Sequence, residues 1–419
     1  MSVLDDIQKS FIKKESIYGP DNYKPLPVVL SKAKGVWVWD VSEKKYLDMM
    51  SGYSAVSHGH AHPVLLKTFH DQSSRLSLTS RAFYTDTLGP YLETITQMTG
   101  FEMALPMNSG AEAVETAIKS SRRWAYRTKK VEENKAEIIV AEGNFHGRTT
   151  TIISFSTDEN SRKDFGPHTP GFVAVEYGSS KAIEDAITPN TAAVIIEPIQ
   201  GEGGIIVPPD NYLNEVRAIC TKHNVLMILD EIQSGLGRTG KLFAYQHSCG
   251  QCSCGENLCE VQPDGLILGK ALGGGFMPVS VFLSSEEVLG WMDTGSHGST
   301  FGGNPLASAL AKRSLELLYE ENLIENSRVM GNYFKEQLTA LNSELIVEIR
   351  GMGLWLGVEI DQKYISGNEL SKTLLEAGIL CKETHENTIR FAPPLVVTKE
   401  ELDWGIEKIA KVFSEVTKS

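Results

Sequence analysis

The stretch Gly265-Leu-Ile-Leu-Gly-Lys-Ala-Leu-Gly-Gly-Gly275 carries one lysine, Lys270, between an apolar run and a glycine-rich turn. The apolar run predicts a buried strand, and the glycines let the backbone after it approach a ligand closely. An amine at such a strand end can be desolvated, which suits a lysine that forms a Schiff base with an aldehyde. A lone lysine at a strand end more often reaches solvent, because lysine is rarely buried without a partner. The hypothesis of a Schiff-base lysine therefore depends on the residues around it.

An acidic residue, Asp230, follows a second apolar run at residues 225–229. If both runs are strands of one parallel sheet, their carboxyl ends share an edge, and Asp230 and Lys270 meet there. Pyridoxal phosphate requires this pair of groups. The lysine amine binds the aldehyde, and a carboxylate keeps the pyridine nitrogen protonated so that the ring can accept electrons from a carbanion. The two residues together predict a pyridoxal-phosphate enzyme.

Short apolar runs, most of them separated by helix-length segments, recur over the middle of the chain. Such a pattern is typical of a mostly parallel sheet covered by helices on both faces. We expect an α/β fold with a large domain over residues 51–305 and a smaller α+β domain over residues 306–419. Residues 1–50 are expected to form an irregular, proline-broken arm and a hairpin that joins the smaller domain. The predicted strands of the large domain are residues 138–141, 192–196, 225–229, 266–268 and 279–283.

The composition is that of an ordinary globular protein, with 41% hydrophobic and 22% charged residues in 419. The net charge of −13 argues against a nucleic-acid or anionic-membrane surface, because both require a basic patch. No segment reaches the roughly 18 uninterrupted apolar residues of a membrane span, and the first residues resemble neither a signal peptide nor a mitochondrial presequence. We therefore expect a cytoplasmic protein whose ligands are small molecules.

A second glycine-rich segment, Gly235-Leu-Gly-Arg-Thr-Gly240, fits the G-x-G-x-x-G pattern of dinucleotide-binding loops. In that motif the glycines follow a strand directly, and an acidic residue ends a strand about twenty positions later. Here residues 230–233 intervene between strand and glycines, and a cysteine-rich loop follows. The pattern therefore gives little support to a nicotinamide-dependent dehydrogenase.

Eight further motifs, in order over nearly the whole chain, resemble those of the class III, fold-type-I, pyridoxal-phosphate-dependent aminotransferases, and most of all the members that act on ornithine. The motifs are Asn22-Tyr-Lys-Pro-Leu-Pro27, Ser51-Gly-Tyr-Ser-Ala-Val56, Leu78-Thr-Ser-Arg-Ala-Phe-Tyr84, Met107-Asn-Ser-Gly-Ala-Glu-Ala113, Asn144-Phe-His-Gly-Arg148, Glu197-Pro-Ile-Gln-Gly-Glu202, Gly298-Ser-Thr-Phe-Gly-Gly-Asn-Pro305 and Ile389-Arg-Phe-Ala-Pro-Pro394. The resemblance implies this fold, pyridoxal 5'-phosphate as the cofactor, and a homodimer with shared active sites.

By the same resemblance, the phosphate of the cofactor lies at Ser109, Gly110 and Ala111, at the start of a helix. A helix N-terminus offers free backbone N–H groups and a positive dipole end, which favour an anion. Without the resemblance, Ser109 would more often be an ordinary N-cap. Thr300 resembles the residue that reaches this phosphate from the second subunit, so a monomer would have an incomplete site.

Three residues resemble those that hold the pyridine ring. Phe145 resembles the aromatic residue that stacks on the ring, and Ile232 resembles the aliphatic residue below it. Gln233 resembles the side chain that hydrogen-bonds the ring hydroxyl. As bare residues Phe145 and Ile232 would more often belong to the core.

The substrate residues also follow from the resemblance. Arg148 would bind the α-carboxylate of the donor through a bidentate fork. Tyr23 would hold the donor's α-amino group, and Tyr53 would line the same pocket. Arg390 would bind the α-carboxylate of glutamate and 2-oxoglutarate. Glu202 would pair with Arg390 while ornithine is bound and swing aside for the dicarboxylate, which is a charge gate.

The reaction expected from the resemblance moves the δ-amino group of L-ornithine to 2-oxoglutarate by a ping-pong mechanism, giving glutamate 5-semialdehyde and glutamate. Lys270 would act as the general base between substrate and cofactor carbons. One residue departs from the ornithine members, which have a tryptophan where this chain has His146, as acetylornithine aminotransferases commonly do. Acetylornithine and 4-aminobutyrate aminotransferases therefore stay as alternatives, followed by an aminomutase and, more distantly, a non-catalytic metal-sensing protein.

Four of the six cysteines, Cys249, Cys252, Cys254 and Cys259, crowd into one loop between Asp230 and Lys270. In a chain expected to be cytoplasmic, such crowding favours a zinc site over a disulfide framework, with His247 as a spare ligand. An iron–sulfur site, a redox-active pair and inert surface thiols are the alternatives.

Overall fold

The computed structural model describes residues 6–249, 260–385 and 387–418. Its largest sheet has seven strands, and β10 runs antiparallel to both of its neighbours, whereas the five strands from β9 to β6 run parallel. In spatial order the strands are β4 (Met103–Met107), β10 (Ser280–Ser284), β9 (Gly265–Leu268), β8 (Leu226–Asp230), β7 (Thr191–Ile196), β5 (Glu137–Ala141) and β6 (Phe172–Val175).

Alternate residues of these strands enter two separate hydrophobic cores. In β7, Val194 belongs to one core and Ile195 to the other, and in β9 Leu266 and Ile267 separate in the same way. Because side chains alternate between the faces of a strand, the sheet has one core on each face. This explains why the strands are continuous apolar runs.

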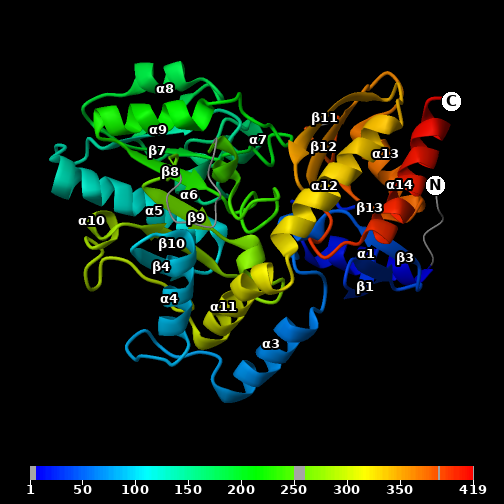
Figure 1. Cartoon of the computed structure of the whole chain (residues 1–419), viewed down its shortest axis with the longest axis horizontal. Coiled ribbons are helices and arrows are strands. Elements are labelled where there is room, and N and C mark those ends of the chain that lie inside the picture. The colour runs from blue at the N-terminus through cyan, green and yellow to red at the C-terminus, as the bar shows by residue number, and fades with distance from the viewer. Residues whose placement is uncertain (1–5, 250–259, 386, 419) are drawn as a thin grey trace.

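Two helices cover the opposite faces of this sheet, as their core residues show. Helix α9 (Tyr212–His223) contributes Val216 to the first core, whereas α5 (Gly110–Trp124) contributes Ala117 to the second. Figure 1 shows this layered part of the molecule on the left. The other helices between residues 51 and 320 are α2 (Ser51–Ser54), α3 (Pro63–Arg75), α4 (Leu88–Thr99), η1 (Ala125–Lys129), α6 (Thr150–Ile153), α7 (Glu159–Arg162), α8 (Ser180–Ala186), η2 (Ala244–Ser248), η3 (Lys270–Gly273), α10 (Glu286–Leu289) and α11 (Pro305–Glu320).

A smaller α+β part combines both ends of the chain. One four-stranded sheet has the order β11 (Ile346–Met352), β12 (Trp355–Ile360), β15 (Thr388–Phe391), β14 (Lys382–Thr384), and the other has the order β1 (Leu30–Lys34), β2 (Trp37–Asp40), β3 (Lys45–Asp48), β13 (Ile379–Leu380). Its helices are α12 (Leu323–Ala340), α13 (Gly367–Glu376) and α14 (Lys399–Val416).

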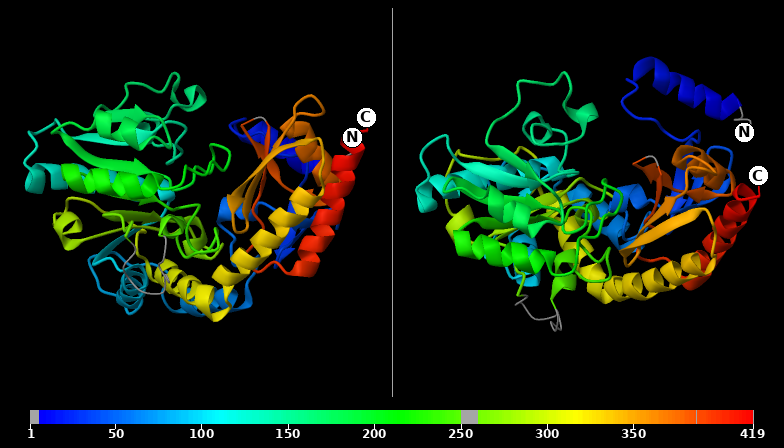
Figure 2. Two further views of the ribbon diagram at one scale, coloured as in Figure 1. Left: turned by 45° about the horizontal axis from the view of Figure 1, so that its top comes forward. Right: turned by 90° about the horizontal axis from the view of Figure 1, so that it is seen from above.

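The two ends of the chain meet where β3 pairs in parallel with β13. Figures 1 and 2 accordingly show the blue N-terminal elements beside the orange and red C-terminal ones. The expected α/β architecture with a smaller α+β part is confirmed, as are the N-terminal hairpin and, within one residue at each end, the five predicted strands. The domain limits at residues 50 and 305 stay a prediction.

The expectation of an irregular N-terminal arm is wrong for residues 6–18, which form helix α1 (Asp6–Tyr18). The first proline of this arm is Pro20. Proline disfavours the helical conformation at its own position and at the residue before it, so a helix can still extend to Tyr18. The helix is mostly exposed, with Gln8 as its buried residue. Among the described residues no helix combines the length and apolarity needed to cross a membrane.

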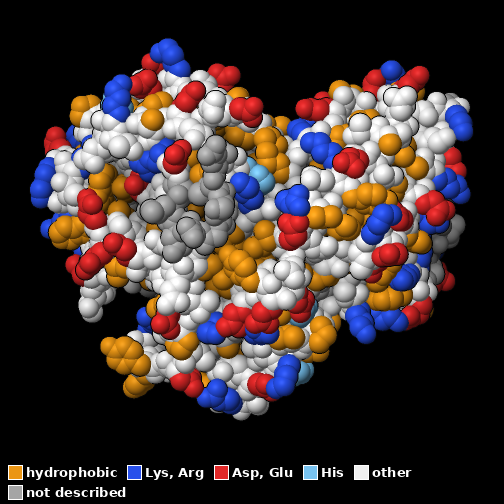
Figure 3. All heavy atoms as spheres, in the orientation of Figure 1, with side chains coloured by type: hydrophobic (Ala, Val, Ile, Leu, Met, Phe, Trp, Pro, Cys, Tyr) orange, Lys and Arg blue, Asp and Glu red, His pale blue; other side chains and the backbone are white. Residues whose placement is uncertain are grey.

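The face of the molecule in Figure 3 carries acidic and basic side chains that are interspersed, and it is hollowed between the two parts at the top of the view. Interspersed charges do not form the extended basic stripe that nucleic acid requires. The absence of a nucleic-acid partner nevertheless stays a prediction.

Candidate active site

The sheet brings Lys270 and Asp230 together. Strands β8 and β9 are parallel neighbours, with Asp230 opposite Ile267, three residues before Lys270. Both side chains line one cavity of about 200 Å³ at the carboxyl ends of these strands. The remaining lining residues are Gly110, Ala111, Phe145, His146, Gly147, Glu197, Ile199, Ile232, Gln233 and Ser234.

The lysine is held in an unusual backbone conformation. Lys270 has φ +45°, in the left-handed region that non-glycine residues seldom occupy outside functional sites. Its Nζ donates a hydrogen bond to Oε1 of Gln233 at 2.9 Å. Burial lowers the pKa of Lys270 to about 8, against the opposing effect of Glu202. A larger fraction of this amine is therefore neutral, and so basic and nucleophilic, than of an ordinary lysine near pH 7.

The carboxylate of Asp230 is buried, lines the cavity, and accepts one hydrogen bond at each oxygen. Its Oδ2 accepts a hydrogen bond from Nδ1 of His146 at 2.7 Å, and its Oδ1 accepts one from the backbone N–H of Ile232 at 3.0 Å. Although burial alone lowers the pKa of His146, its hydrogen bond to Asp230 and the charge there raise it above the ordinary value overall. Sequence reasoning used His146 only as a substrate marker. The structure shows it as the partner that orients Asp230.

A second buried acid, Glu197, lies beside this pair. Its carboxylate accepts hydrogen bonds from the backbone N–H groups of Phe145 and Gly201 at 3.0 and 3.1 Å. Burial raises the pKa of Glu197 to about 7, with His146 acting in the opposite direction. Glu197 therefore fixes the backbone of the two segments that carry Phe145 and Glu202. Its place at the end of β7, like Asp230 at the end of β8, is the signal that could have found it.

The first turn of α5 forms a cradle for an anion. Ser109 caps the helix: its Oγ accepts from the N–H of Glu112 at 3.2 Å, and the carboxylate of Glu112 accepts from the N–H of Ser109 at 2.7 Å. Gly110 and Ala111 are the first residues of the helix, so their N–H groups have no partner within the helix itself. A methyl group added at Gly110 would lie 2.8 Å from Cδ1 of Ile232. A larger residue at this position would therefore have to displace the Ile232 side chain, which lines the cavity.

Two buried polar atoms of residues that line the cavity lack partners in the described part of the chain: Nε2 of Gln233 and Nε2 of His146. Unpartnered buried donors and acceptors are costly, so such atoms call for a ligand or water. With the anion cradle, the half-exposed ring of Phe145 and the Asp230 carboxylate, they fit a flat, phosphate-bearing pyridine cofactor. Pyridoxal phosphate, the cofactor that the sequence motifs predict, is such a molecule.

The proposed charge gate is closed in this structure. Arg390 donates from Nη1 and Nη2 to the two carboxylate oxygens of Glu202 at 2.6 and 3.0 Å. The Arg390 side chain is 3% exposed, and its guanidinium lies 5.0 Å from the centre of the Tyr53 ring. Burial tends to raise the pKa of Glu202, but the Arg390 charge and hydrogen bonds lower it below its ordinary value overall. The two residues, 188 positions apart, meet as the sequence predicts.

Seven of the residues predicted to bind cofactor or substrate are not among those that line the cavity. Ser109 precedes Gly110, which does line it, and Tyr53, Glu202 and Arg390 form the gate. The other three are Tyr23, Thr300 and Arg148. Tyr23 is 75% exposed, and Thr300 is also exposed. Arg148 is exposed, with its guanidinium 5.7 Å from the ring of Phe145. These side chains lie around the site rather than in it within the single chain.

The zinc prediction falls mostly outside the described residues, which exclude Cys252, Cys254 and Cys259. Cys249 is buried and disulfide-bonded, and His247 donates to the carbonyl oxygen of Thr239 at 3.1 Å. Within the described ranges no group of three or more His, Cys, Asp or Glu side chains is arranged to hold a metal ion.

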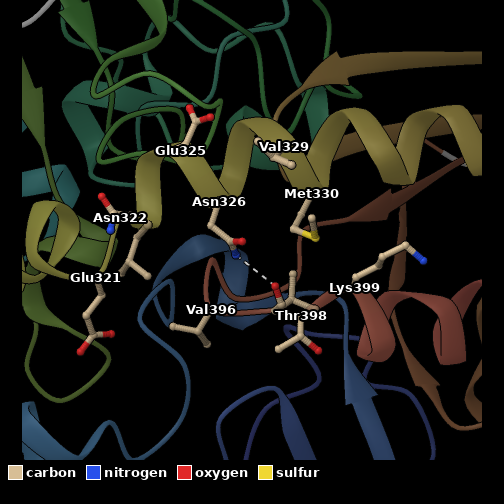
Figure 4. A pocket seen from close by; sticks show the side chains of 11 residues that line it. Glu321, Asn322, Glu325, Asn326, Val329, Met330, Val396, Thr398 and Lys399 are labelled. Carbon is tan, nitrogen blue, oxygen red and sulfur yellow. Dashed lines mark hydrogen bonds between the residues drawn. The ribbon is translucent and has the colours of Figure 1, made fainter.

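A larger hollow, of about 580 Å³, lies away from all of these residues, between the start of α12 and the segment before α14 (Figure 4). Asn326 crosses it and donates to the carbonyl oxygens of Leu395 and Val397 at 2.6 and 3.0 Å. Its acids are engaged as well, since Glu321 contacts His62 and Glu325 pairs with Arg328. The hollow therefore lacks the convergent, unpartnered polar groups that the smaller cavity has.

Known proteins match this chain over almost its whole length. The family model Aminotransferase class-III matches residues 18–413. The ornithine aminotransferase of Brevibacillus brevis is 53% identical over 402 residues, which cover 96% of this chain and 97% of that protein. A structure of the ornithine aminotransferase of Toxoplasma gondii has a TM-score of 0.94 and 41% identity, covering 100% and 97% of the two chains. That of the acetylornithine aminotransferase of Elizabethkingia anophelis has a TM-score of 0.86 and 43% identity, covering 97% and 99%.

Proposed function

The chain belongs to the class-III aminotransferases, and we propose that it transfers the δ-amino group of L-ornithine to 2-oxoglutarate, releasing glutamate 5-semialdehyde and glutamate. The observation that carries the proposal is the closed Glu202–Arg390 pair beside Lys270. An ω-amino donor must keep its own α-carboxylate away from the reacting end. An uncovered Arg390 would attract that carboxylate and present the wrong amine to Lys270.

The two halves of the reaction place opposite demands on Arg390. While ornithine reacts, Glu202 neutralises the guanidinium, and Arg148 and Tyr23 hold the α-amino acid end farther out. When 2-oxoglutarate enters, its α-carboxylate requires a bidentate cation, and Glu202 must withdraw. Tyr53 supports Arg390 through its ring face, which lies 5.0 Å from the guanidinium.

Bound pyridoxal phosphate supplies an aldehyde that accepts the amine and an electron-accepting ring that stabilises negative charge on the substrate carbon. Lys270, with its lowered pKa, would act as the base that takes the proton from the substrate carbon and returns it to the cofactor carbon. Asp230, oriented by His146, would keep a proton on the pyridine nitrogen. Gly110 and Ala111 would bind the phosphate with Ser109 as the cap, Phe145 and Ile232 would enclose the ring, and Gln233 would bind its hydroxyl.

The donor specificity is tested by product formation from L-ornithine, N-acetylornithine and 4-aminobutyrate at equal concentrations. We expect ornithine to give the largest kcat/KM and product formation to require 2-oxoglutarate. Preference for N-acetylornithine would reject the proposed substrate, and turnover without any 2-oxo acid would indicate an aminomutase.

Acetylornithine is the second candidate donor because His146 occupies the position where ornithine-specific relatives were expected to have tryptophan. The structure of the Elizabethkingia acetylornithine aminotransferase, at 43% identity, is as similar in sequence as the Toxoplasma ornithine enzyme. His146, however, contacts Asp230 rather than a substrate-facing group among the described residues, which makes it a weak determinant of the donor.

A homodimer would complete the site. Thr300 is exposed in the single chain, and large aromatic side chains beside it are exposed as well: Phe301 is 50%, Phe83 69% and Tyr84 fully exposed. The segment with Phe301 adjoins the segment with Phe83 and Tyr84, because a methyl group added at Gly303 would lie 3.0 Å from Nη1 of Arg81. Clustered exposed aromatic residues are typical of an interface. We place Thr300 at the phosphate of the partner subunit.

Replacing Thr300 with valine is predicted to weaken pyridoxal-phosphate binding by about tenfold, the effect of one hydrogen bond to a charged group. Thr294→Val, in the same exposed loop, serves as the matched control and should bind normally. Mixed dimers of Thr300→Val and Lys270→Ala subunits test the direction of the contact. In the mixed dimer, Lys270 is present only in the Thr300→Val subunit, whose partner has an intact Thr300. If Thr300 acts across the interface, this site should bind pyridoxal phosphate with wild-type affinity. A tenfold weaker affinity would show that Thr300 acts within its own chain.

Zinc in the loop at residues 249–259 stays a hypothesis, with a redox-active cysteine pair as the alternative. Zinc requires thiolates, so the reduced protein is the one to analyse. We predict about one zinc ion per reduced chain, lost together with some thermal stability in the Cys252→Ser, Cys254→Ser double variant. A wild-type protein without metal would reject the zinc hypothesis.

The cytoplasmic location also stays a prediction.

A further inference from the structure

The segment that carries Glu202 lies against one face of the β11-β12-β15-β14 sheet. In this sheet Arg350 of β11 is opposite Gly357 of β12, and Gly357 is opposite Arg390 of β15. Residues paired across neighbouring strands share a face. Arg350 and Arg390 therefore project from the same face, on either side of a residue that has no side chain.

Glycine at position 357 creates the space that the Glu202 segment fills. A methyl group added there would lie 3.1 Å from the carbonyl oxygen of Gly204. Gly204 has φ +110°, and a methyl group added to it would lie 3.1 Å from Nη2 of Arg350. The backbone two residues after Glu202 thus rests directly on the sheet, between the two arginines.

The guanidinium of Arg350 joins this segment to the strand of Arg390. Its Nε donates to the carbonyl oxygen of Gly204 at 2.7 Å, and its Nη2 donates to Oγ1 of Thr388 at 2.9 Å. Its Nη1 bonds the carboxylates of Glu359 at 2.6 Å and Glu348 at 2.9 Å. The side chain is only 12% exposed. All three nitrogens are engaged, and their planar arrangement fixes the directions of the bonds.

One side chain therefore bonds both the backbone segment that carries Glu202 and the strand that carries Arg390. Gly204 lies two residues after Glu202, and Thr388 lies two residues before Arg390 on the same strand face. Thr384 adds a third anchor, because its Oγ1 donates to the carbonyl oxygen of Glu202 at 2.6 Å.

We propose that Arg350 is a positioning residue that sets the closed geometry of the Glu202–Arg390 pair and so determines how well the enzyme discriminates ornithine from α-carboxylate ligands such as glutamate. This inference rests on the proposed function. A bidentate ion pair is sensitive to shifts of the order of 1 Å, so loosening the segment would leave Arg390 more available to a dicarboxylate. Ornithine, which depends on the covered Arg390, would react more slowly.

Arg350→Lys is the most informative variant, because it keeps the charge that Glu359 requires but cannot span Gly204, Thr388 and the carboxylates at once. Arg350→Gln removes the charge as well. Glu348→Gln is the matched control, since Glu348 is 59% exposed and its loss leaves the contacts to Gly204 and Thr388 in place. Circular dichroism and Tm verify that each variant folds.

The measurements are half-reaction rates of the holoenzyme with L-ornithine and with L-glutamate, and the Kd of glutarate as an unreactive dicarboxylate. In Arg350→Lys we expect kcat/KM for ornithine to fall about tenfold, kcat/KM for glutamate to change less than about twofold, and glutarate to bind several-fold more tightly. Glu348→Gln should behave as the wild type.

The proposed role of Arg350 would be overturned if kcat/KM for ornithine and for glutamate kept their wild-type ratio and the Kd of glutarate did not change. Arg350 would then be a structural residue. Failure of the wild type to use ornithine would instead reject the proposed function. The glutarate affinity still decides the role of Arg350 in that case, because glutarate tests only the availability of Arg390.

Discussion

Lys270→Ala is expected to reduce kcat/KM for ornithine by roughly 10⁴-fold or more, because it removes both the amine that binds the cofactor and the base that moves the proton. The effect is specific to this lysine. It occupies a strained φ of +45° at the end of β9, and burial lowers its pKa to about 8. Other lysines of the chain lack this combination among the described residues. The measurement is the single-turnover rate of the variant loaded with excess pyridoxal phosphate.

Lys241→Ala is a suitable control for that variant. Lys241 lies outside the cavity, where its Nζ donates to the carbonyl oxygen of Gln246 at 2.8 Å. We expect it to retain activity within about threefold, as is usual for substitutions remote from a site. A Lys270→Ala enzyme that kept more than about one hundredth of the wild-type rate would contradict the assignment of Lys270 as the base.

Asp230→Asn is expected to lower kcat/KM by roughly 10²–10³-fold with both amino acids, because a neutral amide no longer stabilises the protonated pyridine nitrogen. The amide oxygen can still accept from the N–H of Ile232, and the amide NH2 can donate to Nδ1 of His146 when that ring carries its proton on Nε2, so the fold should be retained. Stopped-flow half-reactions with ornithine and glutamate measure the effect. Equal losses in both directions are expected, since the ring serves both.

Asp230→Asn distinguishes a residue that acts on the cofactor from residues that bind the substrate. Replacing Glu202 with glutamine should alter the ratio of ornithine to glutamate rates, whereas Asp230→Asn should leave that ratio unchanged. A change of the ratio in Asp230→Asn, or full activity, would show that the carboxylate does not act on the cofactor ring.

The central strands could be predicted because they are continuous apolar runs, such as residues 192–196, buried on both faces. Strand β4 was missed because Pro106 interrupts it, and proline is tolerated there since β4 lies at the edge of the sheet. Strand β6, at the opposite edge, is short and half-buried, so its pattern is weak. Apolar patterns in the sequence thus indicate burial. Edge strands are less buried, so their patterns are harder to recognise.

The site was predictable where one motif carries the chemistry and not where the chemistry depends on tertiary contacts. Lys270 and Asp230 follow recognisable strands, and Glu202 and Arg390 belong to motifs of the resemblance. The contact of His146 with Asp230 spans 84 positions, and that of Arg350 with Gly204 spans 146. No local pattern in the sequence encodes such pairs. The first depends on the order of β5 and β8 within one sheet, and the second on how the segment after β7 packs against the β11-β12-β15-β14 sheet.

The most direct test of the central claim is the visible absorption of the purified holoenzyme before and after addition of L-ornithine alone. We predict that the band of the bound cofactor disappears with ornithine and returns when 2-oxoglutarate is added, because Lys270, Asp230 and the closed Glu202–Arg390 pair admit the δ-amine first. A band that persists with ornithine and is lost only with N-acetylornithine would contradict the proposed donor. If no band formed even with added pyridoxal phosphate, the role of Lys270 itself would be rejected.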